Sequence, residues 1–206
     1  MQDTLKLINS KQLLIFDFDG TLADTSQLHE QAFKEVLAPL NLKFAYQDIA
    51  GMNSNAAFCK ILSDNEETFL NTQINSMVDT KQSIARSLIQ KNLCLEPLVK
   101  NFLDWAYKNS KFTLCIVSSG SRQTIEISIE KLGLQSYFDF LICSEDVQNA
   151  KPSPEGFLKA LDHANFKNDQ AIIFEDSSVG FLAAENANIP YLKVTSHFWK
   201  DLDSIL

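Results

Sequence analysis

Two acidic residues come directly after the first hydrophobic run of the sequence. Asp17 and Asp19 follow residues 13–16 and flank a Gly20-Thr21 turn on its N-terminal side. Because side chains alternate along an extended chain, a spacing of two places both carboxylates on the same side of a strand end. Two carboxylates held together are costly unless a cation neutralises them, and ligands that are all oxygen favour Mg²⁺. The pair therefore predicts a Mg²⁺ site, and a solvated turn with an Asp cap is the alternative.

A second polar segment follows another hydrophobic run. Ser118, Ser119 and Gly120 come after residues 112–117 and supply hydroxyls and backbone N–H groups at the start of a helical pattern. Such groups bind phosphate at helix N-termini. The segment is predicted to bind a phosphate, and an ordinary serine N-cap is the alternative.

Charged residues follow two later hydrophobic runs. Lys151 precedes Pro152, which disfavours a helix at the lysine and holds it in an extended loop. Glu175 and Asp176 come directly after residues 171–174. The alternatives are a solvated lysine, and acidic residues that merely favour a helix N-terminus through its dipole.

Five hydrophobic runs are too short and too rich in β-branched or aromatic residues for independent helices, and they are predicted to be buried strands. Helical patterns separate most of them, which predicts a doubly wound parallel five-stranded sheet of the Rossmann-like α/β class. In such a fold the ligand lies at the carboxyl ends of the strands, where all four polar segments fall. The predicted strands are 13–16, 112–117, 138–143, 171–174 and 191–194, and the helical patterns are 98–106, 125–132, 154–161 and 177–188.

One long segment lacks any strand signal. Residues 26–95 carry three or four amphipathic helical stretches instead. They predict an all-helical cap inserted into a catalytic core that comprises residues 1–25 and 96–206.

Composition limits the partners. The chain has 206 residues and a net charge of −8, so it is expected to be repelled by nucleic acid. No hydrophobic run near its N-terminus approaches the roughly 20 residues of a membrane span, so no membrane contact is expected. Four cysteines without a C-x-x-C pair are expected to be reduced, as in the cytoplasm. No surplus apolar stripe indicates an oligomeric state.

Taken together, the four polar segments resemble those of haloacid dehalogenase-like phosphohydrolases. Within that superfamily the chain is similar to the branch with a small helical cap, which includes β-phosphoglucomutase and sugar-phosphate phosphatases. The resemblance covers nearly the whole chain. It rests on residues 17–25 (DFDGTLADT), 117–120 (VSSG), 151–154 (KPSP) and 175–180 (EDSSVG).

The resemblance implies a role for each matching residue. Asp17 would be the nucleophile that forms an aspartyl-phosphate, and Asp19 would be the general acid and base. Mg²⁺ would be bound by Asp17, Asp176 and the carbonyl of Asp19, with Glu175 acting through water. The residues that would bind the transferring phosphoryl group are Ser118 and Lys151, together with Ser119 and Gly120.

Two cap residues also match the branch. His29 corresponds to a histidine near the site, and Lys81 to a lysine that faces the substrate; a packed histidine and a solvated helix lysine are the alternatives. Mutases of the branch have an arginine that binds a second phosphate where this chain has Ser54. This difference weakens a mutase interpretation.

We therefore expect a Mg²⁺-dependent phosphatase that acts on a small phosphorylated metabolite, such as a sugar phosphate, through an aspartyl-phosphate. The alternatives are a β-phosphoglucomutase-like phosphosugar mutase and a non-catalytic binding protein that kept the fold. Carbon–halogen hydrolysis fits less well, because those dehalogenases lack the second acid that Asp19 supplies.

Overall fold

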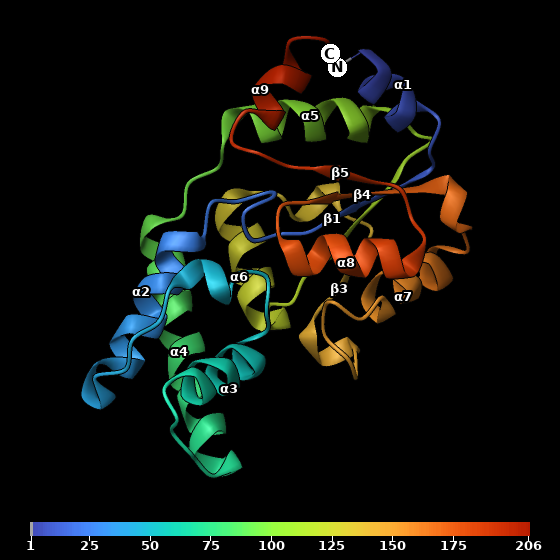
Figure 1. The fold of residues 1–206 in the computed structure, drawn as a ribbon. Helices are drawn as coiled ribbons and strands as arrows, with labels where there is room; N and C mark the ends of the chain where they lie inside the picture. The colour runs from blue at the N-terminus through green and yellow to red at the C-terminus, as the bar shows by residue number, and fades with distance from the viewer. Residues whose placement is uncertain (1) are drawn as a thin grey trace.

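A parallel five-stranded sheet forms the centre of the molecule (Figure 1). The computed structural model describes residues 2–206. The strands are β1 (Leu13–Phe16), β2 (Thr113–Val117), β3 (Phe140–Ile142), β4 (Ala171–Glu175) and β5 (Tyr191–Lys193). They lie in the order β3-β2-β1-β4-β5, and every neighbouring pair is parallel. The predicted sheet is confirmed, although β3 and β5 are shorter than the runs that predicted them.

Helices cover both faces of the sheet (Figure 1). They are α5 (Pro97–Lys108), α6 (Arg122–Leu132), α7 (Glu155–Ala164), α8 (Ser178–Ala187) and α9 (Phe198–Asp203). Buried side chains of β1 alternate between two clusters: Leu14 and Phe16 pack with α5, α6 and α9, whereas Leu13 and Ile15 pack with α7 and α8. A strand that is buried on both faces is what a doubly wound fold requires.

Residues in the left-handed conformation end two of these helices. Gly133 follows α6 with a φ of 67°, and Asn188 follows α8 with a φ of 54°. Two helices, α1 (Gln2–Asn9) and α9, are absent from the predicted elements. Ile8 of α1 is fully buried in the cluster that contains α5.

Three helices between β1 and β2 form the cap. They are α2 (Ser26–Leu37), α3 (Ser54–Asp64) and α4 (Asn71–Asn92). Their apolar faces make a hydrophobic cluster of their own, in which the rings of Phe33 and Phe58 lie 5.0 Å apart. The C-terminal end of α4 does not pack in this cluster. Ile89 and Leu93 pack with α5 and α6 of the core instead. The inserted all-helical cap is therefore present, and α4 ties it to the core.

The cap approaches the core closely at Gly51. Its φ is 78°, and a Cβ placed there would lie 2.5 Å from Ser177 Oγ and 2.7 Å from a Val179 methyl carbon. Glycine alone permits this conformation and this distance. The cap loop therefore rests directly on the start of α8, beside the carboxyl ends of the strands.

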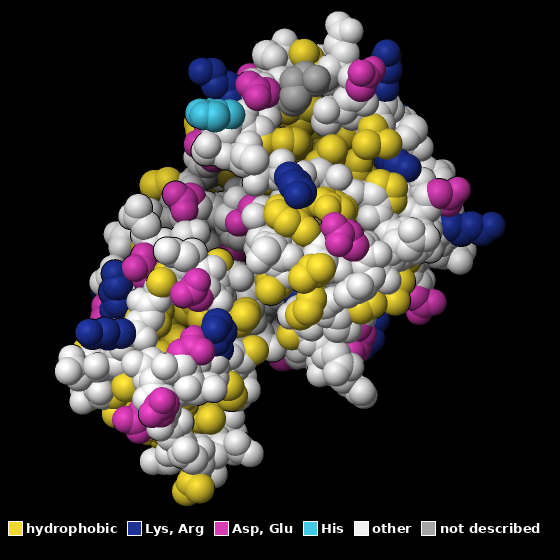
Figure 2. Space-filling model, viewed as in Figure 1, with side chains coloured by type: hydrophobic (Ala, Val, Ile, Leu, Met, Phe, Trp, Pro, Cys, Tyr) yellow, Lys and Arg dark blue, Asp and Glu magenta, His cyan; other side chains and the backbone are white. Residues whose placement is uncertain are grey.

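The surface carries charges of both signs. Acidic and basic side chains are mixed over the face in Figure 2, and hydrophobic side chains gather around α8. Across residues 2–206, no helix is both long and apolar enough to cross a membrane. All four cysteines are free thiols, and Cys115 and Cys143 are buried.

Helix α9 fixes the loop that follows β1. The indole Nε1 of Trp199 donates a hydrogen bond of 3.0 Å to the carbonyl of Thr21. The Trp199 ring also stacks on Phe174, with centroids 5.9 Å apart. Because Thr21 and Trp199 are both buried, water cannot easily replace this bond.

We expect Trp199→Phe to lower the free energy of unfolding by about 1–3 kcal/mol, because the buried Thr21 carbonyl loses its donor while most of the ring packing stays. Urea unfolding at equilibrium measures this loss. Trp105→Phe is the matched control, because Trp105 packs on Phe102 at 5.4 Å but its indole N–H makes no hydrogen bond within residues 2–206. Equal losses in the two variants would show that the hydrogen bond contributes nothing.

Candidate active site

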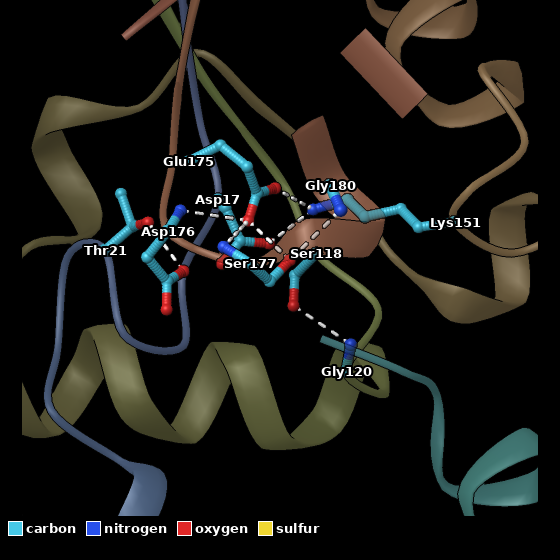
Figure 3. Close-up of polar contacts among 9 residues, drawn as sticks. All are labelled: Asp17, Thr21, Ser118, Gly120, Lys151, Glu175, Asp176, Ser177 and Gly180. Atoms are coloured by element: carbon cyan, nitrogen blue, oxygen red, sulfur yellow. Dashed lines mark hydrogen bonds and ion pairs between the residues drawn. The ribbon is translucent and has the colours of Figure 1, made fainter. Parts of the chain in front are cut away.

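Lys151 links two carboxylates at the carboxyl ends of β1 and β4 (Figure 3). Its Nζ donates to Asp17 Oδ1 at 2.5 Å and to Glu175 Oε2 at 2.7 Å. The side chains of Lys151, Asp17 and Glu175 are only 7%, 9% and 0% exposed. Burial alone would lower the pKa of Lys151, but the charges of Asp17 and Glu175 outweigh burial and raise that pKa above its usual range. Lys151 therefore remains a cation.

The start of α8 holds Glu175 in place. Glu175 Oε1 accepts hydrogen bonds from the Ser177 hydroxyl at 2.8 Å, the Ser177 N–H at 3.0 Å and the Asp176 N–H at 3.1 Å. Gly180 makes room for the carboxylate, because a Cβ there would lie 2.0 Å from the carboxyl carbon of Glu175. Both oxygens of Glu175 are thus engaged by donors of the protein, and its orientation is fixed.

Three carboxylates meet at this point. Asp17, Glu175 and Asp176 each place one oxygen within 4.8 Å of the others. Burial and the charge of Glu175 raise the pKa of Asp17 well above its usual range and that of Asp176 to about 6. Asp17 and Asp176 each keep one oxygen without a hydrogen bond among the described residues. A buried set of repelling oxygen ligands fits a divalent cation.

The loop after β1 closes onto this group. Gly20 has a φ of 88°, and a Cβ there would lie 2.1 Å from Asp176 Oδ2. Thr21 Oγ1 donates to the other oxygen of Asp176 at 3.1 Å. The small residue and the hydroxyl at these two positions therefore let the loop reach Asp176 and orient it.

Asp19 has different partners. Thr25 Oγ1 donates to Asp19 Oδ1 at 2.5 Å, and His29 Nε2 lies 3.1 Å from the same oxygen. Lys81 Nζ lies 3.0 Å from His29 Nδ1, and an ammonium donor at Nδ1 assigns the ring proton to Nε2, which faces Asp19. Burial would raise the pKa of Asp19, but His29 and Thr25 outweigh burial and lower it to about 2.

The side chain of Asp19 is therefore not one of the three grouped carboxylates. The expectation of a shared side assumed that the extended chain continues, but β1 ends at Phe16 and the loop begins at once. Asp19 can join that group only through its backbone carbonyl, which is the contribution that the family resemblance implies.

The serine loop after β2 offers fewer free N–H groups than expected. The N–H of Ser118 donates to the Ile142 carbonyl at 3.0 Å, because parallel pairing with β3 continues past the end of β2. The N–H of Gly120 donates to Ser118 Oγ at 2.9 Å (Figure 3). Ser119 Oγ is buried and has no hydrogen-bond partner among residues 2–206. Ser119 thus presents an unpaired hydroxyl in this loop.

A cavity that is partly open to solvent lies between cap and core. Lys81 reaches it from α4 and is only 6% exposed, so it is not a solvated helix lysine. Burial lowers the pKa of Lys81 to about 8, and the charge of Asp19 opposes this shift. The core side is lined by Asp17, Asp19, Ser119 and Gly120, and the cap side by His29, Tyr46, Ile49, Met52, Ser54 and Lys81.

Several polar side chains of the site, among them Thr21, Thr25 and Tyr46, were not predicted as site residues. Thr21 and Thr25 lie in the acidic segment, but a hydroxyl in a loop has no spacing that reveals its partner. Tyr46 lies in an irregular cap segment that shows no periodicity. By contrast, the four polar segments that follow hydrophobic runs all come together, as the parallel topology predicts.

The sequence and the fold of this chain are similar to those of known proteins. The profile of the haloacid dehalogenase-like hydrolase family matches residues 14–194. A fructose-1-phosphate phosphatase of Escherichia coli (strain K12) is 28% identical over 182 residues, which cover 88% of this chain and 95% of that protein. A phosphorylated carbohydrates phosphatase of Thermotoga maritima is 25% identical over 199 residues, 95% of this chain and 90% of that protein.

A crystal structure of β-phosphoglucomutase from Clostridium difficile has the same fold. The two structures superpose with a TM-score of 0.82 at 23% sequence identity, over 93% of this chain and 87% of the other. The family match extends from β1 to the end of the sheet and includes every core residue of the carboxylate group. The chain therefore belongs to the haloacid dehalogenase-like hydrolase family.

Proposed function

We propose that this phosphoric monoester hydrolase is Mg²⁺-dependent and cleaves a small phosphorylated metabolite through an aspartyl-phosphate. The phosphatase class follows from the family and from the named relatives. The observation that carries the finer proposal is the 2.5 Å contact between Lys151 and Asp17 within the carboxylate group. A cation at this point lets an anionic nucleophile approach an anionic phosphoryl group.

Asp17 and Asp19 divide the chemistry. A carboxylate oxygen of Asp17 attacks phosphorus, and the bond to the leaving oxygen breaks as Asp19 gives that oxygen a proton. Asp19 then takes a proton from water, whose oxygen attacks the phosphorus and releases Asp17 and inorganic phosphate. The pKa of about 2 keeps the Asp19 carboxylate ionised in the free protein, and the negative charge of a bound phosphoryl group would raise that pKa and favour the proton that Asp19 has to carry. Thr25 and His29 act as positioning residues for this carboxylate.

The proposed Mg²⁺ ligands are the side chains of Asp17 and Asp176 and the carbonyl of Asp19, with Glu175 held behind them. When bound, the ion would neutralise charge on the carboxylates and the phosphoryl oxygens. Lys151 and the serine loop (Ser118, Ser119 and Gly120) bind the remaining phosphoryl oxygens. The unpaired hydroxyl of Ser119 supports this assignment.

The cap is proposed to move as a unit. Residues 26–95 would form this unit, and residues 1–25 with 96–206 the catalytic core. The chain crosses between them only near Asp24-Thr25 and near Leu95-Glu96, so the crossings can act as paired hinges. The close approach of Gly51 to α8 supports a closed arrangement, in which water is kept from Asp17 during phosphoryl transfer.

Asp17→Asn should reduce phosphate release from p-nitrophenyl phosphate at least about 100-fold, because the amide is a poor nucleophile and a poor ligand. Circular dichroism checks the fold, and Asp162→Asn on the exposed face of α7 is the control. Chelation of Mg²⁺ should abolish wild-type activity, and added Mg²⁺ should restore it. A folded Asp17→Asn protein that keeps more than about a hundredth of the rate would rule out this nucleophile.

Asp19→Asn should also be nearly inactive, but for another reason. The amide cannot exchange a proton with the leaving oxygen or water, whereas the backbone carbonyl stays in place. Titration calorimetry should therefore show Mg²⁺ binding close to wild type. Loss of Mg²⁺ binding in a folded variant would identify the Asp19 side chain as a ligand and contradict the division of roles.

Lys81→Met should raise KM for the preferred substrate more than KM for p-nitrophenyl phosphate, because the latter's leaving group has few groups that the cap can bind. Methionine keeps an unbranched apolar side chain and removes the ammonium, which lies over the Phe33 ring. The control is Lys91→Met, an exposed position on the same helix. Equal losses on both substrates would assign Lys81 to phosphoryl chemistry or folding instead.

A further inference from the structure

The cap side of the cavity presents one cation, and that cation is already engaged. Lys81 Nζ lies 3.0 Å from His29 Nδ1 and 3.3 Å from Ser54 Oγ. It also lies 4.5 Å from the centroid of the Phe33 ring. An ammonium group has three donor positions, so Lys81 can offer about one further hydrogen bond to a ligand.

Neither arginine of the chain lines this cavity. Arg122 Nη2 donates to Asp146 at 2.5 Å and to the Leu141 carbonyl at 3.3 Å. Arg86 lies on α4 but is not among the lining residues. Arginine binds a phosphate through paired N–H donors, and such donors are therefore missing from the cap side of the cavity, where the leaving group would lie.

Uncharged hydroxyls take the place of such donors. The Tyr46 hydroxyl makes no hydrogen bond within residues 2–206, and Ser54 Oγ has only the long contact with Lys81. Burial, followed by the charges of Asp19 and Asp176, raises the pKa of Tyr46 above its usual range, so the phenol stays a neutral donor. The same charges make the surroundings of Tyr46 negative. Ile49 and Met52 add apolar surface to the cap side of the cavity.

We propose that the cavity takes a monophosphate whose leaving group is an uncharged, hydroxylated alcohol of sugar or polyol type, that it rejects a second phosphate, and that Tyr46 and Ser54 determine this choice. The inference rests on the proposed phosphatase function. A second phosphate carries a charge of about −1.5 to −2 at neutral pH. In this cavity it would lose water and face Asp19, with a single shared lysine as compensation, which is unfavourable.

The wild-type enzyme with Mg²⁺ tests the proposal directly. Phosphate release is measured for two matched pairs, fructose 1-phosphate with fructose 1,6-bisphosphate and glucose 1-phosphate with glucose 1,6-bisphosphate, and for pyrophosphate and p-nitrophenyl phosphate. We expect kcat/KM to be at least about tenfold higher for the monophosphate in each pair, because the second phosphate meets like charge. Pyrophosphate should be a poor substrate for the same reason.

Two variants identify the residues responsible. Ser54→Arg should move the ratio of bisphosphate to monophosphate kcat/KM upward by about tenfold, because it supplies the missing paired donors. Tyr46→Phe should raise KM for the monophosphates about threefold to tenfold more than KM for p-nitrophenyl phosphate, the effect of one lost hydrogen bond. Tyr107→Phe, on an exposed tyrosine of α5, is the control for removal of a phenol hydroxyl.

The outcomes separate this inference from the function on which it rests. If p-nitrophenyl phosphate is hydrolysed and a bisphosphate or pyrophosphate is used as well as the monophosphates, the inference is wrong and the phosphatase function stands. If no compound releases phosphate, the phosphatase function fails and the inference fails with it. Higher activity on the monophosphates, with unchanged ratios in both variants, would refute the roles of Tyr46 and Ser54.

Discussion

The charge of one buried lysine offsets part of the negative charge at the acidic centre of this molecule. Lys151 contacts Asp17 and Glu175, and without it their burial would be strongly unfavourable. The sheet order serves this contact, since β1 and β4 must be neighbours for one ammonium group to reach both acids. The absence of a side chain at Gly180 serves it as well, because a Cβ there would collide with the Glu175 carboxylate.

Asp17 and Asp19 lie two positions apart in the sequence, but their surroundings shift their pKa values in opposite directions. The pKa of Asp17 is raised by burial among other carboxylates, whereas His29 and Thr25 lower the pKa of Asp19 despite its burial. The partners of Asp17 come from the sheet and its loops, whereas Asp19 contacts Thr25, which directly precedes the first cap helix, and His29 on that helix. A displacement of α2 would therefore change the environment of Asp19 and leave that of Asp17 in place.

The core of the site could be predicted because it follows from the hydrophobic pattern. The run 13–16 has the bounds of β1, and parallel strands bring the polar residues that follow them to one edge. The cap contacts could not be predicted in the same way. The sequence of an amphipathic helix does not show whether a lysine on it is solvated or buried. Lys81 is buried because α2 packs against α4. Tyr46 lies where no periodicity exists, so only the packing of the cap reveals it.

The hydrogen bond from Trp199 to Thr21 has a consequence for how the protein is made. Lys151 contacts Asp17 across a separation of 134 residues, and Thr21 contacts Asp176 across 155 residues. Trp199 contacts the Thr21 carbonyl across 178 residues. Contacts between such distant positions form slowly, because long stretches of chain must first be ordered. During synthesis on the ribosome, β1 emerges before its neighbours β2 and β4. Its hydrophobic faces stay uncovered until both of these strands have been made. A nascent chain at that stage is a natural client for chaperones.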